Sequence, residues 1–285
     1  MINNKNFLAL ACLISMLTAC DNDSDGRSSS RVPADAIAIT TDNALNTAKS
    51  SDTAINNALS SFYSTSDTLL PKTSINTAKK SLRLTDFARS LTRKSADAIA
   101  TGAAINETVN CDTGTISISA DFTETPTSEN GNGSITMDNC VYGTVSLHGS
   151  FSYSYSDTID TGNYISGTGT ESTQSLSITT ATATHTITRY SLSYSYNDSS
   201  NSVKRTFGFS SSDLGGGVLF QDTSPWIRNF GDFYPHAGVT VITGSSNSKL
   251  RITALDITQF KLETDADGDD SYETSQVYTW SALYN

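Results

Sequence analysis

Four acidic residues near the C-terminus have the spacing of ligands for a hard metal ion. In the stretch "LETDADGDDSYETSQ", residues 262–276, positions one, three, five and nine of the loop hold Asp265, Asp267, Asp269 and Glu273. Calcium takes several oxygen ligands around one point, and alternate residues of a tight loop can supply them. An EF-hand would need glycine at position six and glutamate at position twelve, where this chain has Asp270 and Gln276. The stretch predicts either a calcium loop or an acidic hairpin turn. Calcium is the one ion that the sequence suggests, and we expect no cofactor to be required by the protein.

A second stretch could bind an apolar or carbohydrate ligand. The segment "DTSPWIRNFGDFYPHAG", residues 222–238, contains the aromatic residues Trp226, Phe230, Phe233 and Tyr234. Aromatic side chains in a loop can form a platform for sugars or apolar molecules. They can equally fold inward and close the end of a β core.

The residues do not assemble a recognisable catalytic motif. The chain has no Gly-x-Ser-x-Gly sequence, and its three histidines, His148, His185 and His236, are far apart and outside any His-Glu-x-x-His pattern. A pair of carboxylates for glycoside hydrolysis would be set by spatial distance, which sequence spacing does not give. We therefore expect a protein that is not an enzyme.

The N-terminus predicts an exported protein. Lys5 precedes an apolar run, residues 7–17, that has the length of a secretion signal and is too short to span a bilayer. The run ends in Leu17-Thr18-Ala19-Cys20, which resembles the lipobox of bacterial lipoproteins. The resemblance implies cleavage before Cys20 and acylation, including palmitate, on that cysteine. The alternative is an ordinary signal peptide with a chance cysteine.

Several acyl chains would hold the protein stably at a membrane, since each buried methylene contributes about 0.8 kcal/mol. Aspartate after the lipidated cysteine resembles the signal that retains lipoproteins at the inner membrane of enteric bacteria. Asp21 therefore favours the periplasmic face of the inner membrane over the outer membrane. The net charge of −11 includes Lys5, the one charge of residues 1–19, and becomes −12 without them. An acidic chain is a poor partner for nucleic acid.

Two cysteines lie outside the signal and the lipobox, and we expect them to pair. Cys111 and Cys140 are an even pair in an exported chain, and an oxidising envelope favours a disulfide between them over two free buried thiols. Zinc ligation by two cysteines alone is not expected, because structural zinc takes four ligands.

The remaining pattern predicts a mainly β (α+β) fold. Residues 20–33 form a polar tether after the signal of residues 1–19. Residues 34–106 show apolar residues at spacings of three and four, which predict two helices separated near Pro71. Seven of the eighteen Lys and Arg residues lie between positions 72 and 94, on a face that contacts anionic headgroups, solvent or the acidic remainder.

Residues 107–285 alternate apolar with Ser and Thr side chains, as in "GTVSLHGSFSYSYSD", which has the period of a half-buried strand. Clusters such as "ENGNG", "NDSSN" and "GSSNS" predict turns between strands. Ten to twelve strands are expected in an antiparallel meander, forming an open sheet or a barrel-like domain.

The C-terminal stretch of residues 234–283 resembles a recurring module of secreted proteobacterial lipoproteins, with Asp270 in place of a usual glycine. The resemblance implies a β-rich envelope protein and brings no known activity. We therefore expect a lipid-anchored envelope protein that binds or scaffolds. The alternatives are a carrier of lipid or another apolar ligand in a β cavity, and an envelope hydrolase.

Overall fold

Twelve strands and one long helix make up most of the part of the chain that the structure describes. The computed structural model describes residues 31–69 and 104–284. It contains helix α1 (Ala44–Leu69), the 3-10 helix η2 (Ser245–Asn247) and the short helix α3 (Ser281–Tyr284). The strands are β1 (Ala104–Asn110), β2 (Thr113–Thr125), β3 (Ser128–Tyr142), β4 (Val145–Asp160), β5 (Asn163–Thr179), β6 (Thr184–Tyr196), β7 (Ser200–Ser211), β8 (Gly216–Asn229), β9 (Ala237–Thr243), β10 (Lys249–Ala254), β11 (Gln259–Asp265) and β12 (Thr274–Thr279).

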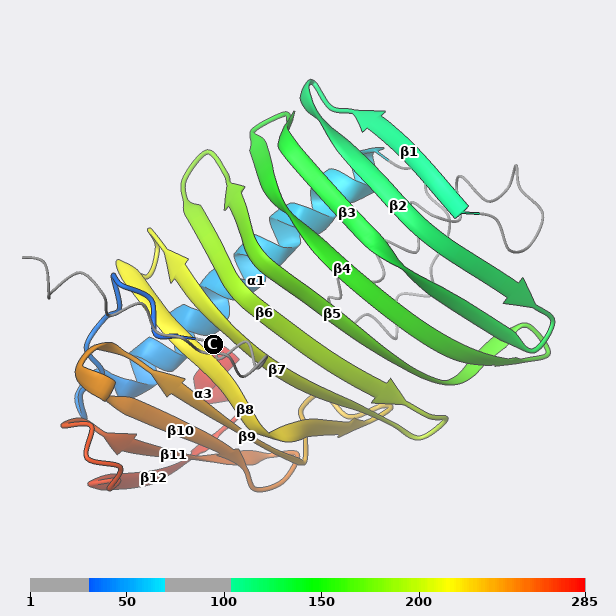
Figure 1. Cartoon of the computed structure of the whole chain (residues 1–285). Helices are drawn as coiled ribbons and strands as arrows, with labels where there is room; N and C mark the ends of the chain where they lie inside the picture. The colour runs from blue at the N-terminus through cyan, green and yellow to red at the C-terminus, as the bar shows by residue number, and fades with distance from the viewer. Residues whose placement is uncertain (1–30, 70–103, 285) are drawn as a thin grey trace, which may run out of the picture.

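The strands form one open antiparallel sheet in chain order. Each strand pairs with the next along the chain, and β1 and β12 lie at the two ends of the sheet (Figure 1). This arrangement confirms the predicted mainly β class and the antiparallel meander, and it is the open form of the two that we expected. The predicted signal, the lipidation site, most of the tether and the second predicted helix lie outside the described residues.

The helical region begins later than its apolar pattern suggests. Ala36 makes a parallel bridge to Gly217 of β8, and α1 starts only at Ala44. A reciprocal pair of hydrogen bonds explains the start: the Thr40 amide donates to Asn43 Oδ1 at 2.7 Å, and the Asn43 amide donates to Thr40 Oγ1 at 3.3 Å. Such paired side chain–backbone bonds satisfy amides that a helix leaves open at its N-terminus.

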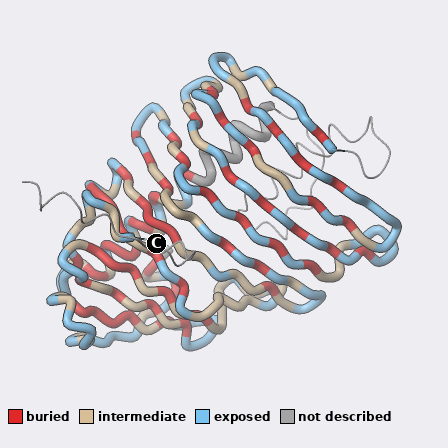
Figure 2. The backbone as a smooth tube through the Cα atoms, viewed as in Figure 1, coloured by how far each residue is buried: buried red, intermediate tan, exposed pale blue. Residues whose placement is uncertain are grey.

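Alternation along the strands sorts side chains onto a buried inner face and an exposed outer face. In Figure 2 buried and exposed positions alternate along the longer strands, and the sequence of β4 shows why, with Phe151, Tyr153 and Tyr155 buried between exposed serines. Helix α1 contacts β4 and β5 (Figure 1). Its buried residues include Ala44, Ala48, Ala54 and Ala58. Small side chains on this stripe let the helix backbone approach the sheet closely.

The predicted turn at "ENGNG" is wrong, because these residues lie inside β3. The turn comes earlier, at residues 126–127, and β3 runs unbroken through Gly131. On the inner face Gly131 lies opposite Tyr155 of β4, and a Cβ on that glycine would approach the tyrosine ring to 2.5 Å. The glycine therefore leaves room for a cross-strand aromatic ring, which is a packing role and not a turn.

Among the described residues, no helix combines the length and the apolar character that crossing a membrane requires.

Candidate metal site and its surroundings

The Asp-rich loop connects β11 to β12 at one corner of the sheet. Strand β11 ends at Asp265, and β12 begins at Thr274, which pairs with Thr264. The neighbouring η2 turn supports the loop from the side, since Asn247 Nδ2 donates to the Gly268 carbonyl at 2.9 Å. The loop therefore packs against η2, beside the start of β10 and the end of β11.

Hydrogen bonds from loop amides to carboxylates fix the conformation. Asp265 is fully buried, and its two oxygens accept the amides of Gly268 at 2.7 Å and Asp270 at 3.0 Å. The Ala266 amide donates to Glu273 Oε2 at 2.9 Å. Gly268 and Asp270 both adopt left-handed backbone conformations, with φ of 79° and 72°. Aspartate tolerates this region better than most residues, so replacement of the usual glycine by Asp270 keeps the turn.

The loop brings together all four carboxylates that the sequence predicts as ligands. One oxygen from each of Asp265, Asp267, Asp269 and Glu273 lies within 4.8 Å of the other three. Asp265 is buried, whereas the other three are exposed. Four negative charges at this separation repel one another, and a divalent cation bound among them would offset that repulsion by attracting each carboxylate. Hard oxygen donors in this number suit calcium.

A lysine already lies beside the loop. Lys249 Nζ is 3.9 Å from Asp265 Oδ2 and also pairs with the Asp270 carboxylate. Its side chain is 14% exposed, so this positive charge is held close to the cluster. Lys249 offsets part of the negative charge and would compete with a cation for Asp265.

The strands beneath the loop carry a second charged network. Glu263 accepts a hydrogen bond from Arg251 Nε at 2.7 Å and pairs with Lys261 at 3.1 Å. The hydrogen bond from Arg251 is the largest of the effects that lower the pKa of the Glu263 carboxyl below its ordinary value. The Arg251 guanidinium also lies 4.0 Å from the ring centre of Tyr272 in the loop. These contacts tie the far side of the loop to β10 and β11.

The four aromatic residues of the predicted ligand platform do not share one environment. Trp226 packs edge-on against Trp280 with ring centres 5.8 Å apart, and Tyr234 stacks on the same ring at 5.9 Å. Trp280 is 1% exposed. Phe230 is half-buried, and Phe233 is 90% exposed. The structure thus joins Trp226 and Tyr234 through a core residue and leaves Phe233 facing solvent.

A buried carboxylate fixes Trp226 on its other side. Asp222 is 2% exposed, and its Oδ1 accepts hydrogen bonds from Trp226 Nε1 at 3.0 Å and from Thr240 Oγ1 at 2.5 Å. Its Oδ2 accepts the backbone amide and Nε of Arg205, at 2.8 and 3.1 Å. Burial opposes the charge on Arg205, but the charge and hydrogen bond of Asp222, together with the charges of Tyr190 and Asp52, outweigh it and raise the pKa of Arg205. Trp226 is thus held by polar bonds as well as by ring contacts.

Three buried acids on the inner face were not predicted from the sequence. Glu129, Asp157 and Glu171 come from the adjacent strands β3, β4 and β5, and each is at most 2% exposed. Tyrosine hydroxyls donate to all three: Tyr155 and Tyr164 to Glu129, Tyr196 to Asp157, and Tyr190 to Glu171. The sequence feature that could have revealed them is the two-residue alternation along a strand. Asp157 occupies the next inward-facing position after Tyr153 and Tyr155.

One histidine is buried beside a serine. His185 Nδ1 lies 2.9 Å from Ser211 Oγ, and the two side chains are 1% and 4% exposed. Burial lowers the pKa of His185, while the charge of Asp213 acts in the opposite direction. This buried contact links β6 to β7.

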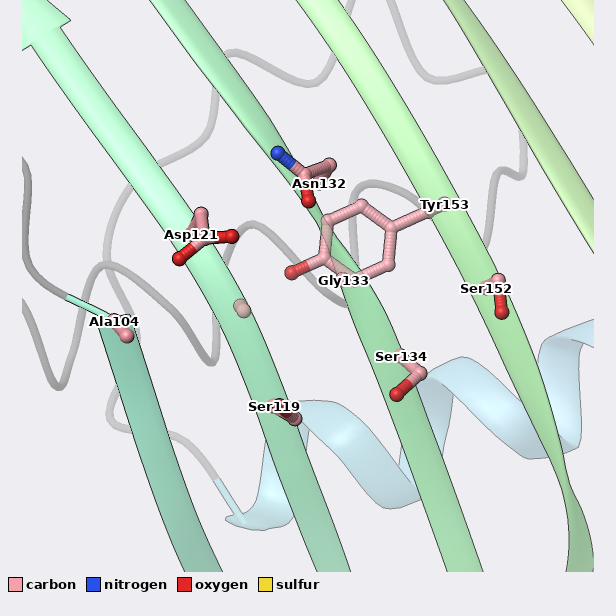
Figure 3. A pocket seen from close by; sticks show the side chains of 9 residues that line it. Ala104, Ser119, Asp121, Asn132, Gly133, Ser134, Ser152 and Tyr153 are labelled. Atoms are coloured by element: carbon pink, nitrogen blue, oxygen red, sulfur yellow. The ribbon is translucent and has the colours of Figure 1, made fainter.

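A shallow depression of about 380 Å³ lies across β1–β4 (Figure 3). Ser119, Asp121, Asn132 and Ser152 line it with polar side chains, and Tyr153 and Gly133 also contribute to its wall. Asp121 and Asn132 are direct cross-strand partners. Its lining is polar where the alternative of an apolar carrier would call for an apolar one.

The predicted disulfide is present at the β1 end of the sheet. Cys111 follows β1, Cys140 lies in β3, and their Cα atoms are 5.4 Å apart. The register between β3 and β4 shifts at Cys140, and Cys140 is completely buried. The bond therefore ties the first hairpin of the sheet to its third strand.

Cys20 lies outside the described residues, so the structure gives no geometry for the predicted lipidation site. Comparison of the chain with known protein families, with curated proteins and with solved structures found no match.

Proposed function

We propose that this chain is a lipid-anchored, non-catalytic protein of the bacterial cell envelope that binds calcium through the β11–β12 loop. One observation carries the calcium site: one carboxylate oxygen from each of Asp265, Asp267, Asp269 and Glu273 lies within 4.8 Å of the others. Two further features support it. The loop amides hold the carboxylates in place, and Asp265 anchors the cluster from inside the fold.

In this proposal calcium is a stabilising ion that holds together the last two strands of the sheet, β11 and β12. The loop joins the last two strands, and in the described structure no strand follows β12. A cation bound to Asp265 and to Glu273 would link the end of β11 to the start of β12. Because calcium would bind the folded loop and not the unfolded chain, it would stabilise the folded state by mass action.

Calcium is expected to raise the thermal midpoint of the full chain relative to chelator. At a calcium concentration about 100 times the dissociation constant, the gain would be about 2.7 kcal/mol. Differential scanning calorimetry in chelator, calcium and magnesium measures it, and magnesium should give less because it accepts such ligand sets poorly.

The matched variants are Asp267→Asn with Asp269→Asn, and Asp160→Asn as a control. Asparagine retains an oxygen that can accept the loop amides but removes two charges, so the calcium shift should disappear in the double variant. Asp160 is an exposed acid at the end of β4, and its variant should keep the full shift. Equal midpoints of the unsubstituted chain in chelator and calcium would refute the calcium site.

Lipid anchoring is supported by Leu17-Thr18-Ala19-Cys20 and by the polar stretch that follows. Cys20→Ser is expected to move the protein from the membrane fraction to the soluble fraction or to leave it as uncleaved precursor. Cys12→Ser, within the predicted signal, should leave the distribution unchanged. Membrane fractionation with mass analysis of the N-terminus distinguishes these outcomes. An unsubstituted protein without acyl groups, together with a Cys20→Ser variant of unchanged distribution, would exclude the anchor.

The two membranes can be distinguished by the residue after the cysteine. Asp21 supports retention at the inner membrane, facing the periplasm. Asp21→Ser would then shift the protein toward the outer membrane, whereas an unchanged distribution would make Asp21 simply the first residue of the tether.

A further inference from the structure

The two end strands of the open sheet differ in how they meet solvent. An end strand exposes a row of backbone N–H and C=O groups that can pair with another chain. Natural proteins protect such strands with charged residues, proline, bulges or a covering element. Strand β12, "TSQVYT", contains no charge and no proline, and its pairing with β11 shows no register shift. Within the described chain, no strand pairs with its outer edge.

Strand β12 also exposes an apolar side chain at its middle. Val277 is 49% exposed, and it lies on the outer face opposite Lys261 of β11. The adjacent Gln276 and Tyr278 lie on the inner face, where Tyr278 stacks on Phe260 with ring centres 5.7 Å apart. The edge is therefore regular in backbone and continuous with the core on its inner side.

We propose that a second copy of this chain pairs with β12 in an antiparallel manner and extends the sheet across a two-fold axis at Val277. In this register Val277 faces Val277 of the partner subunit, and Ser275 faces the partner's Thr279. The interface uses the same edge on both copies, so it closes and leaves neither β12 edge free. Because directly opposed residues lie on the same face of a sheet, the two inner faces become continuous.

Charge selects this orientation. The exposed acids Asp267, Asp269, Asp270 and Glu273 lie just before β12. Parallel pairing would place these two acidic loops side by side, where they repel. Antiparallel pairing places each loop at the opposite end of the partner's strand, about 20 Å away for six residues at about 3.4 Å each.

The other end strand is less suited to pairing with itself. Strand β1 spans seven residues, and Glu107 is its central residue. Antiparallel pairing about that centre would oppose two glutamates, and like charges directly opposite one another are destabilising. Strand β1 can therefore serve as the control for experiments on self-pairing through β12.

Cross-linking tests the register. The full chain carrying Cys12→Ser, Cys20→Ser and Val277→Cys has one cysteine outside the native disulfide. Opposed residues have Cα atoms about 4.5–5.5 Å apart, within the range that a disulfide spans. Mild oxidation should convert most of this chain to covalent dimer, whereas Thr108→Cys on β1 in the same background should stay monomeric.

Sedimentation equilibrium on the chain without an introduced cysteine tests the association itself. We expect a concentration-dependent dimer whose dissociation constant rises at least about tenfold in Val277→Lys, a change of about 1.4 kcal/mol. Thr108→Lys should leave it unchanged. A monomer at all concentrations, preferential cross-linking through Thr108→Cys, or a different protein bound at β12 would each overturn the proposal. A folding defect in Val277→Lys would appear in its circular dichroism, and Val277→Cys then decides alone.

Discussion

Replacing Trp280 with alanine is expected to lower the free energy of unfolding by about 3–5 kcal/mol, the usual cost of removing a large aromatic side chain from a core. Trp280 is 1% exposed, and its ring contacts Trp226, Tyr234 and Phe260. The loss would leave three neighbouring rings around a cavity. Urea unfolding followed by circular dichroism measures the change, which is preferable to fluorescence because the chain has only two tryptophans.

A hydrogen bond adds to the packing loss. Trp280 Nε1 donates to the Asp256 carbonyl at 2.9 Å, so the ring also fixes the β10–β11 turn. Trp280→Phe keeps an aromatic ring and removes the donor, and it should fall between the unsubstituted protein and Trp280→Ala. Phe233→Ala is the matched control, because Phe233 is 90% exposed. Its effect should stay within about 0.5 kcal/mol, as for most surface substitutions. Equal losses in Trp280→Ala and Phe233→Ala would contradict a core role for Trp280.

This comparison also bears on ligand binding by the aromatic segment. Trp226 and Tyr234 pack on Trp280, so removing Trp280 should disturb both at once. Phe233 is free of that constraint and is the member of the predicted platform most open to a ligand. A binding role for the segment would therefore rest mainly on Phe233, with the other rings setting the position of its loop.

The strands were predictable because period-two alternation follows directly from a sheet with one buried face. In β4 the residues Phe151, Tyr153 and Tyr155 alternate with serine, and the structure buries those three. The prediction of a turn at "ENGNG" was wrong for a specific reason. Glycine and asparagine usually indicate turns, but Gly131 lies inside β3 to accommodate the ring of Tyr155. That requirement comes from the partner strand and is not visible in the local sequence.

The site was predictable to a similar extent. Spacing alone predicted that Asp265, Asp267, Asp269 and Glu273 would converge, because a tight loop turns alternate residues toward one point. It did not predict Lys249, which reaches the loop from β10. The inner-face acids were missed because acidic side chains are rarely buried, so residue type alone places them at the surface. Parity along β4 would have placed Asp157 inside, but its tyrosine partner comes from β6.

The proposed calcium loop and the proposed dimer strand are neighbours, and this gives them a testable relation. Both depend on β12, whose first residue follows the acidic loop directly. Calcium would reduce the charge at each end of the antiparallel pair without entering it. The two proposals can therefore fail independently, since Asp267→Asn with Asp269→Asn removes the ion site but leaves Val277 and the edge unchanged.

Removing the Cys111–Cys140 disulfide is the second change with a large expected effect, about 3–4 kcal/mol in the loop-entropy model. The bond joins residues 29 positions apart and ties the end of β1 to β3, across β2. Without it the unfolded chain gains freedom, and strands β1 and β2 at this end of the sheet should open more readily. Urea unfolding of Cys111→Ala with Cys140→Ala, beside the unsubstituted chain with and without reductant, measures both effects.

The reductant comparison makes the disulfide result specific. Reduced unsubstituted protein and the double alanine variant should unfold at similar urea concentrations, and reductant should not change the variant. Hydrogen exchange should show the largest loss of protection in β1 and β2, with β10 and β11 unaffected. Because an oxidising compartment is needed to form the bond, protein retained in the cytoplasm should resemble the variant. An unfolding midpoint of the unsubstituted chain that is the same with and without reductant would show that the bond contributes nothing to stability.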